Sequence, residues 1–280
     1  MPRRTIRRPT ELTGVGLHTG ADVRLRIAPG PSGSGLRFRR TDRPGAGELP
    51  ATLAAVGATD RRTVLGQGDD RVETVEHLLA ALGAHGVDDA LLELAGPEVP
   101  ILDGSFAPFW DVVAAAGLVE GPGCRRRWEV LGPFELAEGD ATYRVSPAGD
   151  LALAVTLVHA EPVIGRQRAD YRGAPGEFAR EIAPARTYGF LAEVEALRAR
   201  GLLAGATSEA AIVLSDTAPL NTSLRWPEEF ARHKLGDLLG DLALLGGPLR
   251  ARVEAERPSH RGNVACARAI AARGRFVEEE

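Results

Sequence analysis

The spacing of apolar residues changes along the chain, and each change predicts a change of secondary structure. In the first 70 residues apolar and polar side chains alternate, and clusters of Gly, Pro and Ser separate the alternating runs, which is typical of short strands joined by turns. From Glu73 the apolar residues fall on one helical stripe of Val75, Leu78, Leu79 and Leu82. The elements expected in this half are strands at 21–29, 35–42 and 88–96, and helices from 73 and from about 106 to 116.

The second half repeats this order of strands followed by helices. Apolar runs between 128 and 159 predict strands, and helical spacing follows them. The later elements expected are helices at 176–182, 191–200, 227–245 and 260–273, with strands at 211–214 and 252–256. Two blocks of strands then helices predict an α+β fold of two similar-sized domains. We place the boundary within 117–127, which gives domains of residues 1–124 and 125–280.

Composition narrows the class of protein. The chain has 280 residues, of which 44% are hydrophobic and 26% charged, as expected of a globular protein with a sizeable core. A net charge of −4 gives no support for binding nucleic acid. No apolar run is long enough to span a bilayer, and the basic N-terminal segment lacks the apolar stretch of a secretory signal. Cys124 and Cys266 are far apart, so neither a disulfide scaffold nor a cysteine-based zinc site is expected, and we predict a cytoplasmic protein.

One residue type is almost absent. Of the 34 residues that are Lys or Arg, only Lys234 is a lysine. Its place beside His233 indicates a site that needs a compact ammonium in preference to a planar guanidinium. The alternative is that this lysine has persisted by chance.

A helix near the C-terminal end carries the strongest candidate for chemistry. His233, Asp237 and Asp241 follow one another at intervals of four residues and therefore share a helix face. An imidazole and a carboxylate one turn apart can bind a single ion, although an ordinary i,i+4 helix pair explains the spacing as well. A third ligand must come from elsewhere, and His77 is the natural candidate. Two histidines, one aspartate and an open fourth position are typical of a catalytic zinc site.

Two other histidine segments are ambiguous by themselves. Glu76 and His77 are adjacent, but residue 81 is Ala, so the zinc-protease pattern with histidines at i and i+4 is absent. The default interpretation of that pair alone is a solvated helix face. His260 follows Ser259 at a predicted helix start, where it is either a polar cap or a second titrating group facing the metal. In the second case Asp241 would favour its imidazolium form.

Six segments together resemble one family, the UDP-3-O-acyl-N-acetylglucosamine deacetylases of lipid A biosynthesis. They occur in the family's order and span nearly the whole chain. The segments are GVGLHTG (14–20), TVEHLLAAL (74–82), PEVPILDGS (97–105), ARTYGF (185–190), EEFARHKLGDLLGDL (228–242) and SHRGN (259–263). The resemblance implies two α+β domains, each a sheet with two main helices, whose helical layers pack between the two sheets with the active site at the junction.

The resemblance also implies a reaction and a catalytic apparatus. The reaction is hydrolysis of the acetamide of an acylated UDP-sugar to a free amine and acetate. The implied zinc ligands are His77, His233 and Asp237, a ligand set that also accepts iron(II). Glu76 is implied as the general base. His260 is implied as the cationic partner that protonates the leaving amine or stabilises the oxyanion.

Further roles that the resemblance implies concern orientation and substrate binding. Asp241 would orient His260, and Thr187 would help to hold the oxyanion. Lys234 would contact the reacting region or the substrate, and Tyr188, where the family commonly has Phe, would pack on the sugar. The implied partner is the acylated UDP-sugar alone, with no nucleic acid and no transmembrane segment, and we expect a monomer.

The acyl chain of such a substrate needs an apolar channel. Residues 190–205 match the family's second insert, and the residues expected at the channel mouth are Leu202, Leu203 and Gly205. A helix and turn that pack into the core would give the same sequence.

Some positions depart from the family or have no assigned role. Ala141 stands where family members can carry a phosphate-binding lysine, which Arg144 or Arg166 would replace unless the diphosphate is bound more weakly. SHRGN also differs from the GHxxN common in the family. His18 is not needed as a ligand, and a structural role is at least as well supported. Asp103 indicates turn or domain-junction chemistry.

Two other functions compete with this hypothesis. One is a zinc amidohydrolase that acts on a different N-acyl sugar or amino acid. The other is a catalytically silent homologue that binds a sugar nucleotide as a regulator or scaffold. The presence of both Glu76 and His260, neither of which is an expected metal ligand, argues against the silent homologue.

Overall fold

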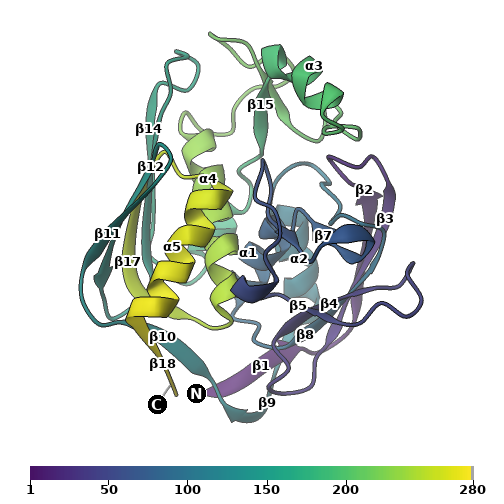
Figure 1. The fold of residues 1–280 in the computed structure, drawn as a ribbon, viewed down its shortest axis with the longest axis vertical. Helices are drawn as coiled ribbons and strands as arrows, with labels where there is room; N and C mark the ends of the chain where they lie inside the picture. Colours follow the sequence, from purple (N-terminus) through teal and green to yellow (C-terminus); the bar gives the residue numbers. More distant parts are fainter. Residues whose placement is uncertain (279–280) are drawn as a thin grey trace.

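The computed structural model, which describes residues 1–278, has the expected α+β architecture. Two sheets form the outer layers, and helices from both halves of the chain lie between them (Figure 1). The layers form because each half buries its own apolar cluster between a sheet and its helices. No helix in the described part of the chain is both long and apolar enough to cross a membrane.

The first half is built on a five-stranded sheet with the order β2-β3-β8-β4-β5. Its strands are β2 (Thr10–Val15), β3 (Asp22–Pro29), β8 (Ala90–Ala95), β4 (Leu36–Arg40) and β5 (Leu49–Pro50). Two small ribbons accompany it, β1 (Pro2–Ile6) with β9 (Leu118–Cys124) and β6 (Val64–Leu65) with β7 (Val72–Glu73). Alternating side chains of β8 are buried, so one face of the sheet packs against the helices α1 (Glu76–His85) and α2 (Ala107–Ala116).

The second half is built on a seven-stranded sheet in which β17 occupies the centre. The strands are β10 (Arg126–Val130), β11 (Phe134–Glu138), β12 (Ala141–Pro147), β13 (Ala152–Val158), β14 (Arg166–Tyr171), β17 (Leu249–Glu256) and β18 (Gly274–Glu278). The helices α4 (Glu229–Leu242) and α5 (His260–Arg273) cover its inner face (Figure 1). The hydroxyl of Ser259 accepts a hydrogen bond from the Gly262 N–H at 3.1 Å and so caps α5.

A separate excursion projects from one end of the second half. It contains β15 (Tyr188–Phe190), α3 (Leu191–Ala199) and β16 (Ile212–Leu214), and it lies at the top of Figure 1. Two ion pairs, Arg61 with Glu193 and Arg200 with Asp60, join it to a loop of the first half.

The two halves meet where α1 packs against α4, and glycines of α4 set how close the helices come. A Cβ at Gly240 would lie 2.1 Å from the Glu76 carbonyl oxygen, and one at Gly236 would lie 2.3 Å from the ring of Phe106. No side chain fits at such separations, so α4 lies directly against the α1 backbone at Gly240 and against the Phe106 ring at Gly236.

Two expectations about helices need correction. The helix expected at 176–182 is a single π-helical turn, Phe178–Ile182. The helix expected from Glu73 begins at Glu76, because Thr74 has a left-handed backbone with φ of 58°.

The domain boundary at 124/125 stays a proposal. It is supported by the pairing of strands, because within residues 1–278 no strand that ends by Cys124 pairs with one that begins at or after Arg126.

Candidate active site

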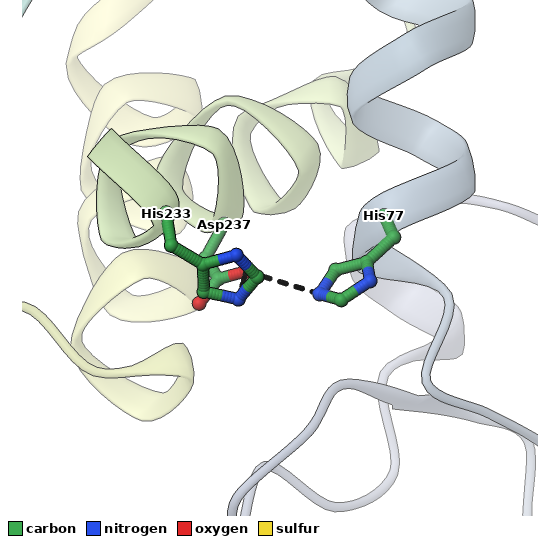
Figure 2. Close-up of side chains that lie close together, drawn as sticks. All are labelled: His77, His233 and Asp237. Carbon is green, nitrogen blue, oxygen red and sulfur yellow. Dashed lines mark ion pairs between the residues drawn. The ribbon is translucent and has the colours of Figure 1, made fainter. Parts of the chain in front are cut away.

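Three buried side chains from the two facing helices converge on one point (Figure 2). His77 comes from the first turn of α1, and His233 and Asp237 from one face of α4. Nε2 of His77 lies 3.5 Å from Oδ1 of Asp237, and Nε2 of His233 lies 3.4 Å from the same oxygen. One ligand atom from each residue lies within 4.8 Å of the others. The predicted solvated face around Glu76 and His77 is therefore wrong, since both side chains are buried.

The polar atoms of this cluster fit a divalent cation. Oδ1 of Asp237 is buried and has no hydrogen-bond donor among the described residues, although it faces two imidazole nitrogens. An unpaired carboxylate oxygen in the interior is costly, and a bound cation would remove that cost. Two imidazoles and one carboxylate form a ligand set that suits zinc or iron(II).

The protonation states in the cluster also favour a cation. Burial lowers the pKa of His233 to about 3, so its ring is neutral. Its Nδ1–H donates to the Ala185 carbonyl at 3.1 Å, which leaves the lone pair of Nε2 facing Asp237. Burial opposes ionisation of Asp237, but the positive charges of His233, which is protonated only at acid pH, and of Lys234 outweigh it and hold the pKa of this carboxyl well below its usual range.

Glu76 lies beside the cluster at the start of α1. Its side chain is 3% exposed, and burial raises the pKa of its carboxyl above the usual value. Oε2 accepts a hydrogen bond from the Thr63 backbone N–H at 3.0 Å, and Oε1 lies 3.8 Å from Nε2 of His260. A carboxylate held in this way, with a raised pKa, is suited to accept a proton near neutral pH.

His260 faces the same site from the N-terminal end of α5. Its Nδ1 donates to Oδ2 of Asp241 at 3.0 Å, and its Nε2 is directed towards Glu76 and Asp237. Burial lowers the pKa of His260, but the carboxylates of Asp241 and Glu76 outweigh burial and raise it to about 9. The ring is therefore an imidazolium at neutral pH and can donate a proton from Nε2. A simple capping role is excluded, because Ser259 provides the cap.

Three further predicted residues lie around this cluster. Nζ of Lys234 donates to Oδ2 of Asp237 at 2.9 Å and lies 6.0 Å from the centre of the Tyr188 ring. Tyr188 is half-buried and packs against Phe230. The backbone of Thr187 joins Gly104 to Ile212 through two hydrogen bonds of 2.8 Å.

The residues expected at a channel mouth contact the loop of residues 14–20. The Gly205 N–H donates to the Leu17 carbonyl at 3.0 Å, and a Cβ at Gly205 would lie 2.1 Å from the Gly16 carbonyl oxygen. Leu202 is buried, whereas Leu203 is half-buried and packs with the cluster around Leu17. These contacts dock the turn on the first half, and its part in a channel stays a proposal.

The two arginines considered for the diphosphate, and Asp103, have partners within the protein. Arg144 pairs with Glu135, and Arg166 pairs with Glu256. Asp103 accepts hydrogen bonds from the backbone and hydroxyl of Ser105, as expected for turn chemistry.

His18 is buried, and burial lowers its pKa to about 4. Its backbone N–H donates to the carboxylate of Glu98, and its Nδ1 has no partner within residues 1–278.

The sequence patterns do not single out four residues that shape the site. Thr63 contacts both Glu76 and Asp241, and Asn263 donates to Oδ2 of Asp241 at 2.9 Å. The ring of Phe106 lies 4.7 Å from that of His77 and 5.0 Å from that of His233. Buried Glu98 accepts hydrogen bonds from Thr19 and Thr74 as well as from His18. Glu98 and Asn263 lie within the quoted motifs, but Phe106 and Thr63 lie in none of them.

Comparison with known proteins agrees with this geometry. The model of the family described as UDP-3-O-acyl N-acetylglycosamine deacetylase matches residues 3–272. A UDP-3-O-acyl-N-acetylglucosamine deacetylase of Phenylobacterium zucineum is 41% identical over 276 residues, which cover 98% of this chain and 94% of the relative. The enzymes of the same name from Myxococcus xanthus and Neisseria meningitidis are 40% and 39% identical, over 92% and 97% of this chain and 82% and 91% of their own lengths. The chain therefore belongs to the UDP-3-O-acyl-N-acetylglucosamine deacetylase family.

Proposed function

We propose that this protein is a zinc-dependent hydrolase that removes the acetyl group from a UDP-3-O-acyl-N-acetylglucosamine in lipid A biosynthesis. The products are acetate and the free-amine sugar nucleotide. The observation that carries the proposal is the cluster of His77, His233 and Asp237 beside a buried carboxylate and an imidazolium. The names of the relatives supply the substrate.

The proposed metal is held by His77, His233 and Asp237. When bound, zinc, or iron(II) in its place, polarises a carbonyl and lowers the pKa of water. The close contact of α1 with α4 brings the ligands from the two helices together.

Glu76 and His260 divide the proton transfers between them. Glu76 takes the proton of the attacking water, for which its raised pKa suits it. His260 then gives the proton on Nε2 to the leaving amine, since a neutral amine is a far better leaving group than an amide anion. Asp241 holds the ring through Nδ1, so that Nε2 stays directed into the site. Each general acid or base of this kind contributes about 10²–10⁴-fold in rate.

The remaining residues are proposed to bind the substrate. The hydroxyl of Thr187 would donate to the developing oxyanion. Lys234 contacts the reacting region, and Tyr188 packs on the sugar. Leu202, Leu203 and Gly205 border the acyl chain.

Binding of the diphosphate and the cellular context complete the proposal. Arg144 or Arg166 would bind the diphosphate only by exchanging its present carboxylate partner. We propose a cytoplasmic monomer with domains of residues 1–124 and 125–280.

An acetate-release assay on the purified, metal-analysed protein tests the proposal. We expect turnover of the 3-O-acylated UDP-sugar and much slower turnover of the non-acylated one. Equal turnover of the two would favour a zinc amidohydrolase with another substrate, and no turnover of either would favour a silent homologue.

A variant of the base tests the mechanism in the same assay. Glu76→Ala is expected to keep the metal and to lose turnover by about 10²-fold or more. The control is Glu120→Ala on exposed β9, which should match the unmodified protein. Turnover of Glu76→Ala at the control level would contradict the assignment of the base.

A further inference from the structure

We propose that Thr63 is a positioning residue that holds the base and the acid of the reaction in one geometry. The proposal rests on the proposed function, because it needs Glu76 and His260 to act as base and acid. Thr63 is fully buried and lies in the loop just before β6. It is in the first half of the chain, whereas Asp241 and His260 belong to the second.

The backbone of Thr63 fixes the base. Its N–H donates to Oε2 of Glu76 at 3.0 Å, and its carbonyl accepts from the Val75 N–H at 3.3 Å, one residue before α1 begins. One carboxylate oxygen of Glu76 is therefore occupied, and the other, Oε1, is left facing His260. A base with one engaged oxygen has a defined direction from which it takes a proton.

The side chain of Thr63 fixes the acid indirectly. Its hydroxyl donates to Oδ1 of Asp241 at 2.5 Å and lies 3.4 Å from Nδ1 of His260. Oδ2 of Asp241 accepts hydrogen bonds from Nδ1 of His260 and from the side-chain amide of Asn263. Among residues 1–278, Thr63 is the only side chain with a hydrogen bond to Oδ1.

The three donors together leave Asp241 no freedom to rotate. Without the hydroxyl, Oδ1 would be a buried charged oxygen with no donor, and the carboxylate would turn to find one. Because Nδ1 of His260 is hydrogen-bonded to Asp241, the ring would turn with the carboxylate, and Nε2 would then move away from the leaving amine. The substrate is not touched by this change, so kcat should fall while KM stays nearly constant.

Variants that differ only in the hydroxyl test the role. Thr63→Val keeps the shape of the side chain and removes the donor, and we expect kcat to fall by about tenfold, or about 1.4 kcal/mol of barrier. KM and bound metal should stay within twofold of the wild type. Thr63→Ser restores the hydroxyl and should recover most of kcat, whereas Thr63→Ala should resemble Thr63→Val. Recovery by Ser separates positioning from a loss of packing, because Ser is smaller than Val.

A double-mutant cycle with Asp241→Asn tests the route through Asp241. If Thr63 acts through this carboxylate, Thr63→Val should cost less than about twofold in the Asp241→Asn background. The matched control is Thr5→Val in β1. It removes a hydroxyl that accepts from the Gly30 backbone N–H, outside the candidate active site, and should leave kcat unchanged.

The outcomes separate this proposal from the proposed function. If the wild type is active and Thr63→Val has the same kcat, only the role of Thr63 is overturned and the proposed function stands. The same follows if Thr63→Val loses tenfold both in the wild type and in the Asp241→Asn background. A rise in KM with kcat unchanged would also overturn it, since it would mean that Thr63 binds substrate. An inactive wild type would reject the proposed function and this proposal with it.

Discussion

Asp237 divides its two carboxylate oxygens between partners of different kinds. Oδ1 faces the Nε2 atoms of His77 and His233, and Oδ2 accepts from Nζ of Lys234. Burial opposes the charge of Lys234, but Asp237 outweighs burial and raises the pKa of the amine above its ordinary value, so this residue is an ammonium. The ammonium pairs with Oδ2 and leaves Oδ1 for the proposed metal. This division gives the only lysine of the chain a specific place.

The preference for a compact ammonium can be tested by Lys234→Arg. A guanidinium is longer and planar, and it would contact both oxygens of Asp237 in place of one. We expect kcat/KM to fall by about tenfold or more, since the guanidinium would compete with the proposed metal for Oδ1. Steady-state kinetics with metal analysis is the measurement. Arg172→Lys in an exposed loop is the control, and normal kinetics in both variants would mean that Lys234 persists by chance.

Among single residues, the sequence predicts those whose chemistry is tied to a helical period. His233 and Asp237 are recognisable because four residues make one turn, and the observed helix brings both to one side. The place of His77 opposite them depends on how α1 packs on α4, which spacing alone does not determine. Thr63 has no such period, since it lies in a loop and acts through contacts 13 and 178 residues away in sequence.

At the scale of elements, the site depends on the separation between α1 and α4. The α1 backbone at Glu76 and the α4 backbone at Gly240 touch. Of the proposed ligands, His77 is next to Glu76, and His233 and Asp237 lie in the turns of α4 before Gly240. A metal site tolerates only small errors in the distance between its ligands. Glycines lower the stability of a helix, and those of α4 are therefore explained by the close contact with the first half of the chain that they allow.

Gly240→Ala tests this explanation. The new methyl group would overlap the Glu76 carbonyl, so the helices must separate. We expect the free energy of unfolding to fall by about 1–3 kcal/mol and metal affinity to weaken by about tenfold or more. Denaturant titration and competition with a chelating dye measure the two effects.

Gly83→Ala is the matched control on the facing helix. Its nearest neighbour, the Cβ of Ala243, would be 3.7 Å away, which is an ordinary contact. That variant should be up to about 1 kcal/mol more stable through helix propensity and should bind metal normally. Weaker metal binding in both variants alike would show that helix rigidity, and not the contact at Gly240, controls the site.

The elements that the sequence predicts well are those with a local signal. A helix is expected over 260–273, and α5 spans His260–Arg273, because Ser259 provides a recognisable cap. The pairing of β1 with β9 joins residues more than a hundred positions apart and has no local signal. The π-helical turn at Phe178–Ile182 has the apolar spacing of an α-helix, so the pattern predicts a helix but not its type.

At the scale of the whole molecule, the active site is made from both halves of the chain. The first half gives Thr63, Glu76 and His77, and the second gives the other two proposed metal ligands and His260. The apolar clusters of the two halves are largely separate, so the polar site and the α1–α4 contact join them. A metal bound by both halves therefore acts as a cross-link.

Removal of the metal should consequently lower the stability of the entire protein. A ligand that binds only the folded state at a free concentration of about a thousand times Kd adds about 4 kcal/mol. For a chain of this size that loss corresponds to a fall in Tm of about 10 °C on adding a chelator. Differential scanning calorimetry with and without the chelator measures it. Asp237→Ala, which lacks one ligand, should show almost no further fall.

A histidine outside the ligand set provides the control for that experiment. His85 lies on the same helix as His77, stacks on Trp110 and donates from Nε2 to the Trp110 carbonyl at 3.0 Å. His85→Gln should lower the initial Tm but keep the full response to the chelator, because the metal ligands are untouched. If the chelator shifted Asp237→Ala and His85→Gln equally, the cation would be bound elsewhere, and the junction of the two halves would not be the metal site.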